Sequence, residues 1–183
     1  MKVSRGRLLP SSLLVLAAAS TLRTLEAKAA NQVTTTNSGL RIIDFQTGDG
    51  PTPNFGQLIN FHYVVYLPSQ DGTSLTPIDS SYQRTPYLTK HGNGFTAQGI
   101  EEALHTMRKG GRRRVILPPQ LGFTANKGPL PPQKSAMDML FNAVAERSPL
   151  VFDLELTDIF DDLLDRGDYN EMTWDEYVAK YNL

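Results

Sequence analysis

The stretch Leu58–Leu67 reads LINFHYVVYL and contains the clearest structural pattern in this sequence of 183 residues. Successive side chains of a β-strand point to opposite faces, so an apolar residue at every second position predicts a strand with one face against a core. That face would contain Ile59, Phe61, Tyr63, Val65 and Leu67. Residues 150–157 repeat the pattern, and their inward face would contain Leu150, Phe152, Leu154 and Leu156.

Other segments predict the elements that surround these two strands. Further strands or extended segments are predicted at residues 40–43, 78–82 and 112–117, and the last of these is closed by Pro118 and Pro119. A short helix is predicted after Gly99 and before Gly110-Gly111, because apolar residues recur at i, i+4 and i+7 as Ile100, Leu104 and Met107. One helix among several strands of the antiparallel type indicates an α+β domain.

Composition excludes several classes of function. The formal net charge is -1, with 18 basic and 19 acidic residues, so no global field would recruit nucleic acid or an anionic membrane. The chain has no cysteine, which excludes disulfides, thiol catalysis and thiolate metal sites. Its three histidines lack metal-ligand spacing, so no metal site is predicted. The one basic cluster, residues 108–114, is interpreted as a solvated strand face.

Residues 1–29 have the order of an export signal. Three basic residues precede an apolar stretch over residues 8–22, and Ala27-Lys28-Ala29 provides a small-x-small cleavage site. The apolar stretch is shorter than the roughly 20 residues of a membrane-spanning helix, and an uncleaved anchor is the alternative. Residues 30–37 are polar and rich in threonine, so they are predicted to form a flexible linker before a domain over residues 38–160.

Two more segments are predicted to be helical. In residues 133–149, Ser135 can cap a short helix with one apolar face, which either packs on its own sheet or selects a substrate or partner. That face contains Met137, Leu140, Phe141 and Val144. Residues 161–183 form an acidic extension whose Thr173 and Glu176 match a capping box, with Met172 and Tyr177 as a hydrophobic staple. The aromatic residues of this tail would dock on the domain or on a partner protein, and they are Trp174, Tyr177 and Tyr181.

An ordered set of segments over residues 38–160 resembles the FKBP-type peptidyl-prolyl cis/trans isomerase family. The segments include Gly48-Asp49-Gly50-Pro51, His62-Tyr63, Ile78-Asp79-Ser80-Ser81, Gly99-Ile100-Glu101-Glu102-Ala103-Leu104, Leu130-Pro131-Pro132 and Leu150-Val151-Phe152-Asp153. The resemblance implies a twisted antiparallel sheet of about five strands wrapped over one short helix. The active cleft would lie between the sheet and this helix.

The resemblance also implies a chemistry and a substrate class. The chain would isomerise X–Pro bonds of proline-containing polypeptides and act as a folding helper. Rotation about this bond crosses a barrier of about 18–20 kcal/mol, most of it lost amide resonance. The twisted amide is less charge-separated than the planar one, so an apolar pocket that excludes water favours the twisted state. This chemistry requires no nucleophile, metal or cofactor.

Family positions transfer to individual residues of this sequence. The resemblance implies catalytic roles for Tyr63, Asp79, Phe123 and Phe152. It implies substrate contacts for Ile78, Arg84, Tyr87, Thr96, Ala97, Ile100 and Leu130. In this scheme Arg84 holds the Asp79 carboxylate, and the backbone of residues 96–97 binds the peptide. From periodicity alone, Tyr63 and Phe152 would be ordinary core aromatics, and Asp79 with Arg84 would be a surface ion pair.

The sequence departs from the family pattern at two important positions. Ile100 stands where the family has a tryptophan at the pocket floor, and Phe123 stands where it has a tyrosine whose hydroxyl bonds the ligand. A lost hydrogen bond of this kind is worth about 0.5–1.5 kcal/mol. We therefore expect a pocket that admits proline but turns over weakly. The alternative is a non-catalytic binding module whose insert and tail dock on a larger assembly.

The resemblance extends to location. An export signal on a chain without cysteine is similar to lumenal FKBP-type proteins of chloroplasts. This similarity implies the thylakoid lumen and, for the binding module, association with a thylakoid membrane complex, for example during photosystem assembly. A bacterial periplasm and the secretory pathway are the alternatives.

Overall fold

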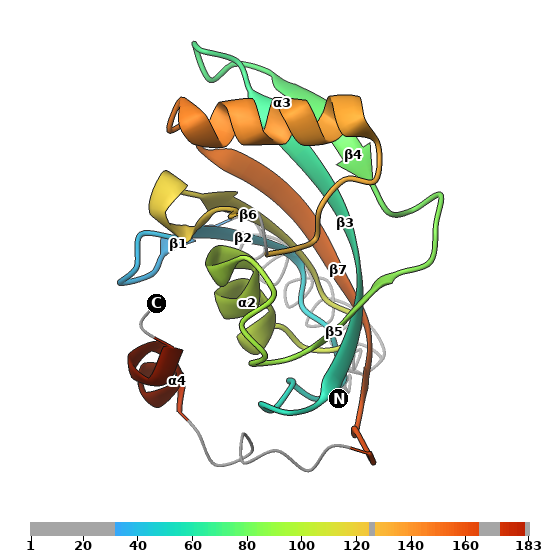
Figure 1. Ribbon diagram of the computed structural model, residues 1–183. Helices are drawn as coiled ribbons and strands as arrows, with labels where there is room; N and C mark the ends of the chain where they lie inside the picture. Colours follow the sequence, from blue (N-terminus) through green and yellow to red (C-terminus); the bar gives the residue numbers. More distant parts are fainter. Residues whose placement is uncertain (1–31, 125–126, 165–172, 182–183) are drawn as a thin grey trace, which may run out of the picture.

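The computed structural model describes residues 32–124, 127–164 and 173–181, and Figure 1 shows their arrangement. The strands are β1 (Val33–Thr35), β2 (Arg41–Gln46), β3 (Leu58–Pro68), β4 (Leu75–Ser80), β5 (Tyr87–Lys90), β6 (Arg112–Leu117) and β7 (Leu150–Phe160). The helices are α2 (Gln98–His105), α3 (Lys134–Ala145) and α4 (Trp174–Tyr181), with a short 3-10 turn at Pro119–Leu121. The mixture confirms the α+β class.

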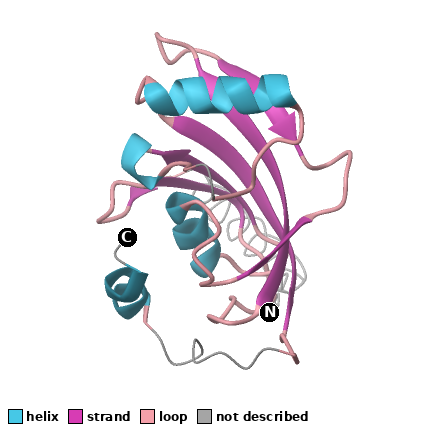
Figure 2. Cartoon of the chain, viewed as in Figure 1, coloured by secondary structure: helices cyan, strands magenta, loops and turns pink. Residues whose placement is uncertain are grey.

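One antiparallel sheet contains every strand of the described residues. Its order is β1-β2-β6-β7-β3-β4, and β5 also pairs with β3. The sheet curves around α2, as the strands in Figure 2 show. The two strands with the clearest sequence pattern are neighbours, because β3 pairs with β7 through Phe61↔Leu156, Tyr63↔Leu154 and Val65↔Phe152. Their predicted inward residues, except the partly buried Leu67, lie in the hydrophobic core.

Helix α2 covers the concave face of the sheet, as the sequence predicted. Ile100, Ala103 and Leu104 are fully buried in the core cluster. The helix lies so close to β6 that a Cβ on Gly99 would come within 2.9 Å of Leu117 Cγ. Gly99 is the second residue of the helix, and its lack of a Cβ allows this close approach. Met107 follows the helix instead of belonging to it, and it is also buried.

The sheet has seven strands instead of about five. One of the additional strands, β1, lies within the segment predicted to be a linker and pairs with β2 through Thr34↔Ile42. All three β1 residues are exposed, so no alternation marked them, although the β-branched Val33 and its threonine neighbours favour extended structure. The other, β5, has only four residues and pairs with the first part of β3.

The basic cluster on β6 is not a uniformly solvated face. The Arg113 side chain is only 8% exposed and lies on the inward face of the strand. Its Nε and Nη2 donate to the Asp44 carboxylate at 2.6 and 3.1 Å, and its Nη1 donates to the Ala103 carbonyl at 2.7 Å. The interpretation as a solvated face was therefore wrong for Arg113, whose buried charge is paired with Asp44 and hydrogen-bonded to the end of α2, as burial requires.

The inserted helix α3 is longer than expected and crosses one end of the sheet (Figure 1). Its N-cap is Gln133 without a side-chain hydrogen bond, so the predicted Ser135 cap is wrong. Ala136, Leu140 and Ala143 are its most buried residues, and Leu140 and Ala143 belong to the core cluster. This burial favours the interpretation in which α3 packs on its own domain.

The ends of the chain test fewer predictions. The export signal and the staple residue Met172 lie outside the described residues. The predicted capping box before α4 is present, because the Glu176 carboxylate accepts from the Thr173 N–H at 2.7 Å. Figure 1 shows α4 outside the concave face that holds α2. Among the described residues, no helix is long and apolar enough to cross a membrane.

Candidate functional site

A hollow of about 410 Å³ opens between β3, the segment after β4 and the turn before α3. Its walls are formed by Tyr63, Ser81, Arg84, Thr85, Pro86, Tyr87, Leu88, Leu130 and Pro132. Small-ligand sites of this size combine apolar and aromatic walls with a few fixed polar groups. The hollow can therefore accept a compact apolar group such as a proline ring.

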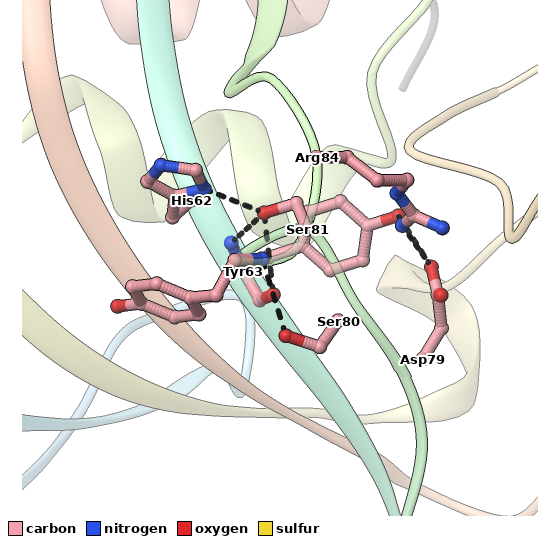
Figure 3. A network of polar contacts seen from close by, with 7 residues as sticks. His62, Tyr63, Asp79, Ser80, Ser81 and Arg84 are labelled. Atoms are coloured by element: carbon pink, nitrogen blue, oxygen red, sulfur yellow. Dashed lines mark hydrogen bonds and ion pairs between the residues drawn. The ribbon is translucent and has the colours of Figure 1, made fainter.

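A cluster of three polar side chains lies at this hollow. The Tyr63 hydroxyl donates to the Asp79 carboxylate at 2.6 Å, and Arg84 Nη2 donates to the same carboxylate oxygen at 2.8 Å. Arg84 Nη2 also lies 3.2 Å from the Tyr63 hydroxyl, so each member contacts the other two. Figure 3 shows the phenol and the guanidinium converging on Asp79.

The protonation state of each member follows from its neighbours. Burial alone would raise the pKa of the Asp79 carboxyl, but the hydrogen bonds from Arg84 and Tyr63 outweigh it and hold that pKa below its usual range. Burial and the bond to Asp79 raise the pKa of the Tyr63 hydroxyl well above its ordinary value. Near neutral pH the cluster thus contains an ionised carboxylate, a protonated phenol and a guanidinium.

Ser81 connects the turn after β4 to β3. Its hydroxyl accepts the Tyr63 N–H at 2.8 Å, while its own N–H donates to the Tyr63 carbonyl at 3.0 Å. The Arg84 N–H then donates to the Ser81 carbonyl at 2.8 Å, which closes the turn and returns Arg84 toward Asp79. The side chain of Ser81 is buried, so this connection is protected from water.

A second layer of contacts supports the turn from the outer face of the sheet. His62 Nδ1 lies 3.0 Å from the Ser81 hydroxyl, and the His62 ring stacks on Tyr82 with centroids 4.7 Å apart. The Tyr82 hydroxyl donates to Glu155 at 2.6 Å. Burial and this bond raise the pKa of Tyr82 to about 12. Ser81, in the turn that positions Arg84, therefore contacts both Tyr63 and His62, as Figure 3 shows.

Several predicted site residues lie behind the hollow. Phe123 stacks on Phe152 at 5.4 Å, and Phe152 lies 6.1 Å from the Tyr63 ring. Phe123, Phe152 and Ile100 are at most 3% exposed and do not line the hollow. Ile100, which the family resemblance places at the pocket floor, lies in the core behind the rings of Tyr63 and Tyr87 that stand at the wall.

The backbone of the segment predicted to bind peptide already has partners within the chain. The Ala97 N–H donates to the Gly128 carbonyl at 2.8 Å, and the Gly128 N–H donates to the Phe95 carbonyl at 2.7 Å. The Thr96 hydroxyl lies 3.1 Å from the hydroxyl of Thr89, and both are buried. A peptide could use the Ala97 N–H only by displacing Gly128.

The structure thus brings together five of the predicted residues, and the others lie in or against the core. Tyr63, Arg84, Tyr87 and Leu130 line the hollow, and Asp79 contacts two of them. Ile78 packs partly buried against the core, and Thr96 and Ala97 are buried. The sequence analysis missed Ser81, Thr85, Pro86, Leu88 and Pro132 as lining residues. Their position in sequence between or beside Asp79, Arg84, Tyr87 and Leu130 was the available signal.

Comparison with known proteins agrees with this geometry. The family model described as FKBP-type peptidyl-prolyl cis-trans isomerase matches residues 50–157, which is more than half of the chain. The solved structure of FkpA from Escherichia coli is similar, with a TM-score of 0.51 and 28% identity over 80% of this chain and 59% of that chain. The chain belongs to the FKBP-type peptidyl-prolyl cis-trans isomerase family.

Several curated relatives come from Arabidopsis thaliana. Peptidyl-prolyl cis-trans isomerase FKBP16-3, chloroplastic, is 33% identical over 67% of this chain and 49% of its own length. The protein named Photosynthetic NDH subunit of lumenal location 4, chloroplastic, is 31% identical over 67% of this chain and 54% of its own length. The chain therefore spans about half the length of these curated relatives.

Proposed function

We propose that the chain binds proline-containing polypeptides in the hollow and accelerates cis/trans rotation of their X–Pro bonds. The supporting observation is an apolar wall of Tyr63, Tyr87 and Leu130 beside the fixed Asp79–Arg84 ion pair. Family membership supports the same activity. The reaction is an isomerisation of one amide, so the residues only have to bind, orient and exclude water.

Each part of the hollow has a role in this mechanism. Tyr87 and Leu130 remove water from the proline ring and from the amide, which destabilises the planar, charge-separated amide relative to the twisted one. The Asp79 carboxylate, bonded to Tyr63 and Arg84, fixes the two sides of the opening relative to each other. Preorganised walls of this kind lower the barrier without proton transfer.

The same geometry supports weak turnover. Ile100 and Phe123 are buried behind the hollow and do not line it, so neither side chain adds a contact to a substrate bound there. The Ala97 N–H is bonded to Gly128, so a bound peptide gains that contact only after another is broken. We expect measurable binding of proline peptides and a catalytic efficiency at the low end of the usual range for enzymes, about 10⁴ M⁻¹s⁻¹.

Turnover of a proline tetrapeptide, measured by protease-coupled assay and by NMR exchange, tests the proposal. Leu130→Ala should lower the rate at least about fivefold because it removes an apolar wall. Leu164→Ala is the matched control, since Leu164 is 98% exposed and distant in sequence from the hollow. Absence of both binding and turnover in the unaltered chain would refute the proposed function.

A second candidate is a binding subunit of a larger assembly. It is supported by the relative whose name describes an NDH subunit and by the helix α4, whose sequence contains Trp174, Tyr177 and Tyr181. Deleting residues 161–183 tests it. Unchanged thermal unfolding together with loss of the chain from an affinity-purified membrane complex would support this role, whereas a large loss of stability would contradict docking in trans.

We propose the chloroplast, and within it the thylakoid lumen, as the location. The support is the chloroplastic names of both relatives and the word lumenal in one of them, together with the basic, apolar and cleavable order of residues 1–29. Protease protection of the native protein in intact thylakoids tests this location. Digestion without prior disruption of the membranes would contradict it.

A further inference from the structure

Three titratable side chains on and before α2 have no role in the mechanism above. Glu101 and His105 belong to α2, and His91 lies in the segment between β5 and α2. His91 is fully buried and Glu101 is 1% exposed, whereas His105 is partly exposed. A buried carboxylate and imidazole are costly unless they pair with each other, so their arrangement requires a physical explanation.

The three side chains form a continuous chain of contacts. His91 Nδ1 lies against Glu101 Oε1, and His91 Nε2 lies 2.9 Å from His105 Nδ1. Phe55 stacks on both imidazoles, with centroids 4.7 Å from His91 and 4.8 Å from His105. With both rings neutral, His105 Nδ1–H can donate to His91 Nε2, and His91 Nδ1–H can donate to Glu101, which satisfies each contact.

Glu101 links this row of three side chains to the segment before α2. Its Oε1 accepts the Gly92 N–H at 2.6 Å, and Gly92 begins the segment that leads to Thr96 and Ala97. Gly92 has a φ of +86°, and a Cβ there would lie 2.7 Å from the Phe55 ring, so this backbone is tightly constrained. The Glu101 charge, after burial, also raises the pKa of Tyr87 in the wall of the hollow.

His105 connects these three side chains to water through a second cavity of about 410 Å³, which lies on the β1 and β2 side of α2. The other charged groups around this cavity are Asp44 on β2, Arg113 on β6 and Glu102 on α2, and Asp44 is paired with Arg113. Burial, and to a smaller extent His91, lower the pKa of His105, while the Glu101 carboxylate raises it. The folded arrangement therefore favours an uncharged His105.

We propose that Glu101, His91 and His105 are positioning residues that make the prolyl hollow responsive to pH. A proton taken up at His105 from the second cavity places positive charge against His91. A proton passed to His91 makes its existing Nδ1–H bond to Glu101 Oε1 charge-assisted, which draws that oxygen away from the Gly92 N–H. The segment from Gly92 to Ala97 then loses this contact. Ala97 in turn contacts Gly128, which packs against the Tyr87 hydroxyl in the wall of the hollow. This inference rests on the proposed function and deepens it.

The direction of the effect follows from linkage. The pKa of His105 in the folded protein is below its ordinary value near 6.5. The stabilisation that the folded state gains from a neutral His105 is therefore present above about pH 6.5 and is lost as pH falls. If the pKa of His105 differs by about one unit between the binding-competent state and the loosened state, affinity for proline peptides falls at most about tenfold on acidification. We expect a decrease of about three- to tenfold between about pH 8 and about pH 5.

A pH profile of kcat/KM for an uncharged proline tetrapeptide tests this proposal. X–Pro rotation transfers no proton, so a catalyst without the proposed proton relay through His105, His91 and Glu101 gives a flat profile over this range. The unaltered chain should lose activity on the acidic side through KM, with kcat little changed. His105→Gln should flatten the profile, whereas His62→Gln should keep its midpoint whatever its absolute rate. A flat profile in the unaltered chain, or an unchanged one in His105→Gln, would overturn the proposal.

NMR of the unaltered full chain gives a readout that does not depend on activity or on a variant that folds. The imidazole signals of His105 and the amide signal of Gly92 should titrate with one shared midpoint below about pH 6.5. A Gly92 amide that stays constant while His105 titrates would refute the relay even if isomerase activity is present. A shared titration in a chain without isomerase activity would refute the proposed function alone.

Discussion

The Phe123 ring stacks on Phe152 with centroids 5.4 Å apart and an interplanar angle of 22°, and both side chains are buried in the core behind the hollow. A hydroxyl at the tip of the Phe123 ring would therefore enter packed apolar surroundings instead of reaching a ligand.

Phe123→Tyr should consequently destabilise the fold without improving catalysis. A buried hydroxyl without a partner costs about 1–3 kcal/mol, which urea denaturation would detect as a lower free energy of unfolding. Phe45→Tyr is the control, because Phe45 is 41% exposed and its new hydroxyl would reach water. Unchanged stability combined with faster isomerisation in Phe123→Tyr would show that the ring tip reaches the hollow.

Asp79→Asn removes the charge that Arg84 and Tyr63 hold while keeping the size of the side chain. We expect the free energy of unfolding at neutral pH to fall by about 1–2 kcal/mol, a modest figure because the Arg84 side chain remains 31% exposed. The pKa of Asp79 is lowered in the folded state, so its contribution is present above about pH 4 and is lost as pH falls further.

Denaturation of both proteins at neutral pH and at about pH 3 measures this dependence. The difference between Asp79→Asn and the unaltered chain should shrink in acid. Asp138→Asn serves as a control, since Asp138 forms an exposed i,i+4 pair with Lys134 that contributes about 0.5 kcal/mol or less. A difference that does not change with pH would contradict the role given to the Asp79 charge.

Gly128 and Tyr87 should show a strong coupling. A Cβ at position 128 would lie 2.2 Å from the Tyr87 hydroxyl oxygen, so Gly128→Ala must displace the Tyr87 ring or the backbone. We expect a loss of about 1–3 kcal/mol in stability and weaker binding of proline peptides. Tyr87→Phe should partly restore both in the double variant, because the nearest remaining ring atom would lie 3.0 Å away.

The double-variant cycle for Gly128→Ala and Tyr87→Phe, measured by thermal unfolding, gives the coupling free energy directly. Additive effects of the two substitutions would mean that the two residues do not pack against each other. Gly72→Ala provides a comparison, since no atom lies within 4 Å of a Cβ there and only the φ of +69° opposes alanine.

Arg114 and Arg112 allow a matched test of the outer face of the sheet. Arg114 donates to both Asp153 oxygens at 2.6 and 2.7 Å and lies over the rings of Phe45 and Tyr66. Arg114→Lys removes the bidentate geometry and the planar stacking, so it should lower stability by about 1 kcal/mol. Arg112→Lys should cost less than about 0.5 kcal/mol, because Arg112 is exposed and its Nε lies as far as 3.9 Å from the Glu155 carboxylate.

The elements that sequence analysis predicted are those whose patterns are local. The strand containing Phe61 and the helix containing Ile100 repeat apolar residues at intervals set by their own geometry. Strand β1 has no buried face, so it left no periodic signal. Arg113 was misinterpreted because its partner Asp44 lies 69 residues away, and no local pattern indicates a contact at that separation.

The site was predicted to a similar extent and for a similar reason. Family resemblance located Tyr63, Asp79 and Arg84, whose mutual hydrogen bonds the structure contains. Whether an apolar residue such as Phe152 faces the hollow or the core depends on packing depth, which the sequence does not express. The bond between Ala97 and Gly128 was likewise unpredictable, because it depends on how the turn before α3 closes against the helix start.

The position of β3 has a consequence for how the chain reaches its native state. This strand pairs with β4 and β5, which follow it closely, and also with β7, where Tyr63 faces Leu154. Pairing Tyr63 with Leu154 closes a long loop of the chain, and the entropy of loop closure is lost before the new contacts compensate for it. Domains rich in such distant pairings fold in milliseconds to seconds. A ribosome-bound chain cannot complete its core until β7 has emerged. Until then, the apolar face of β3 and the strand edge that pairs with β7 are available to chaperones or to aggregation.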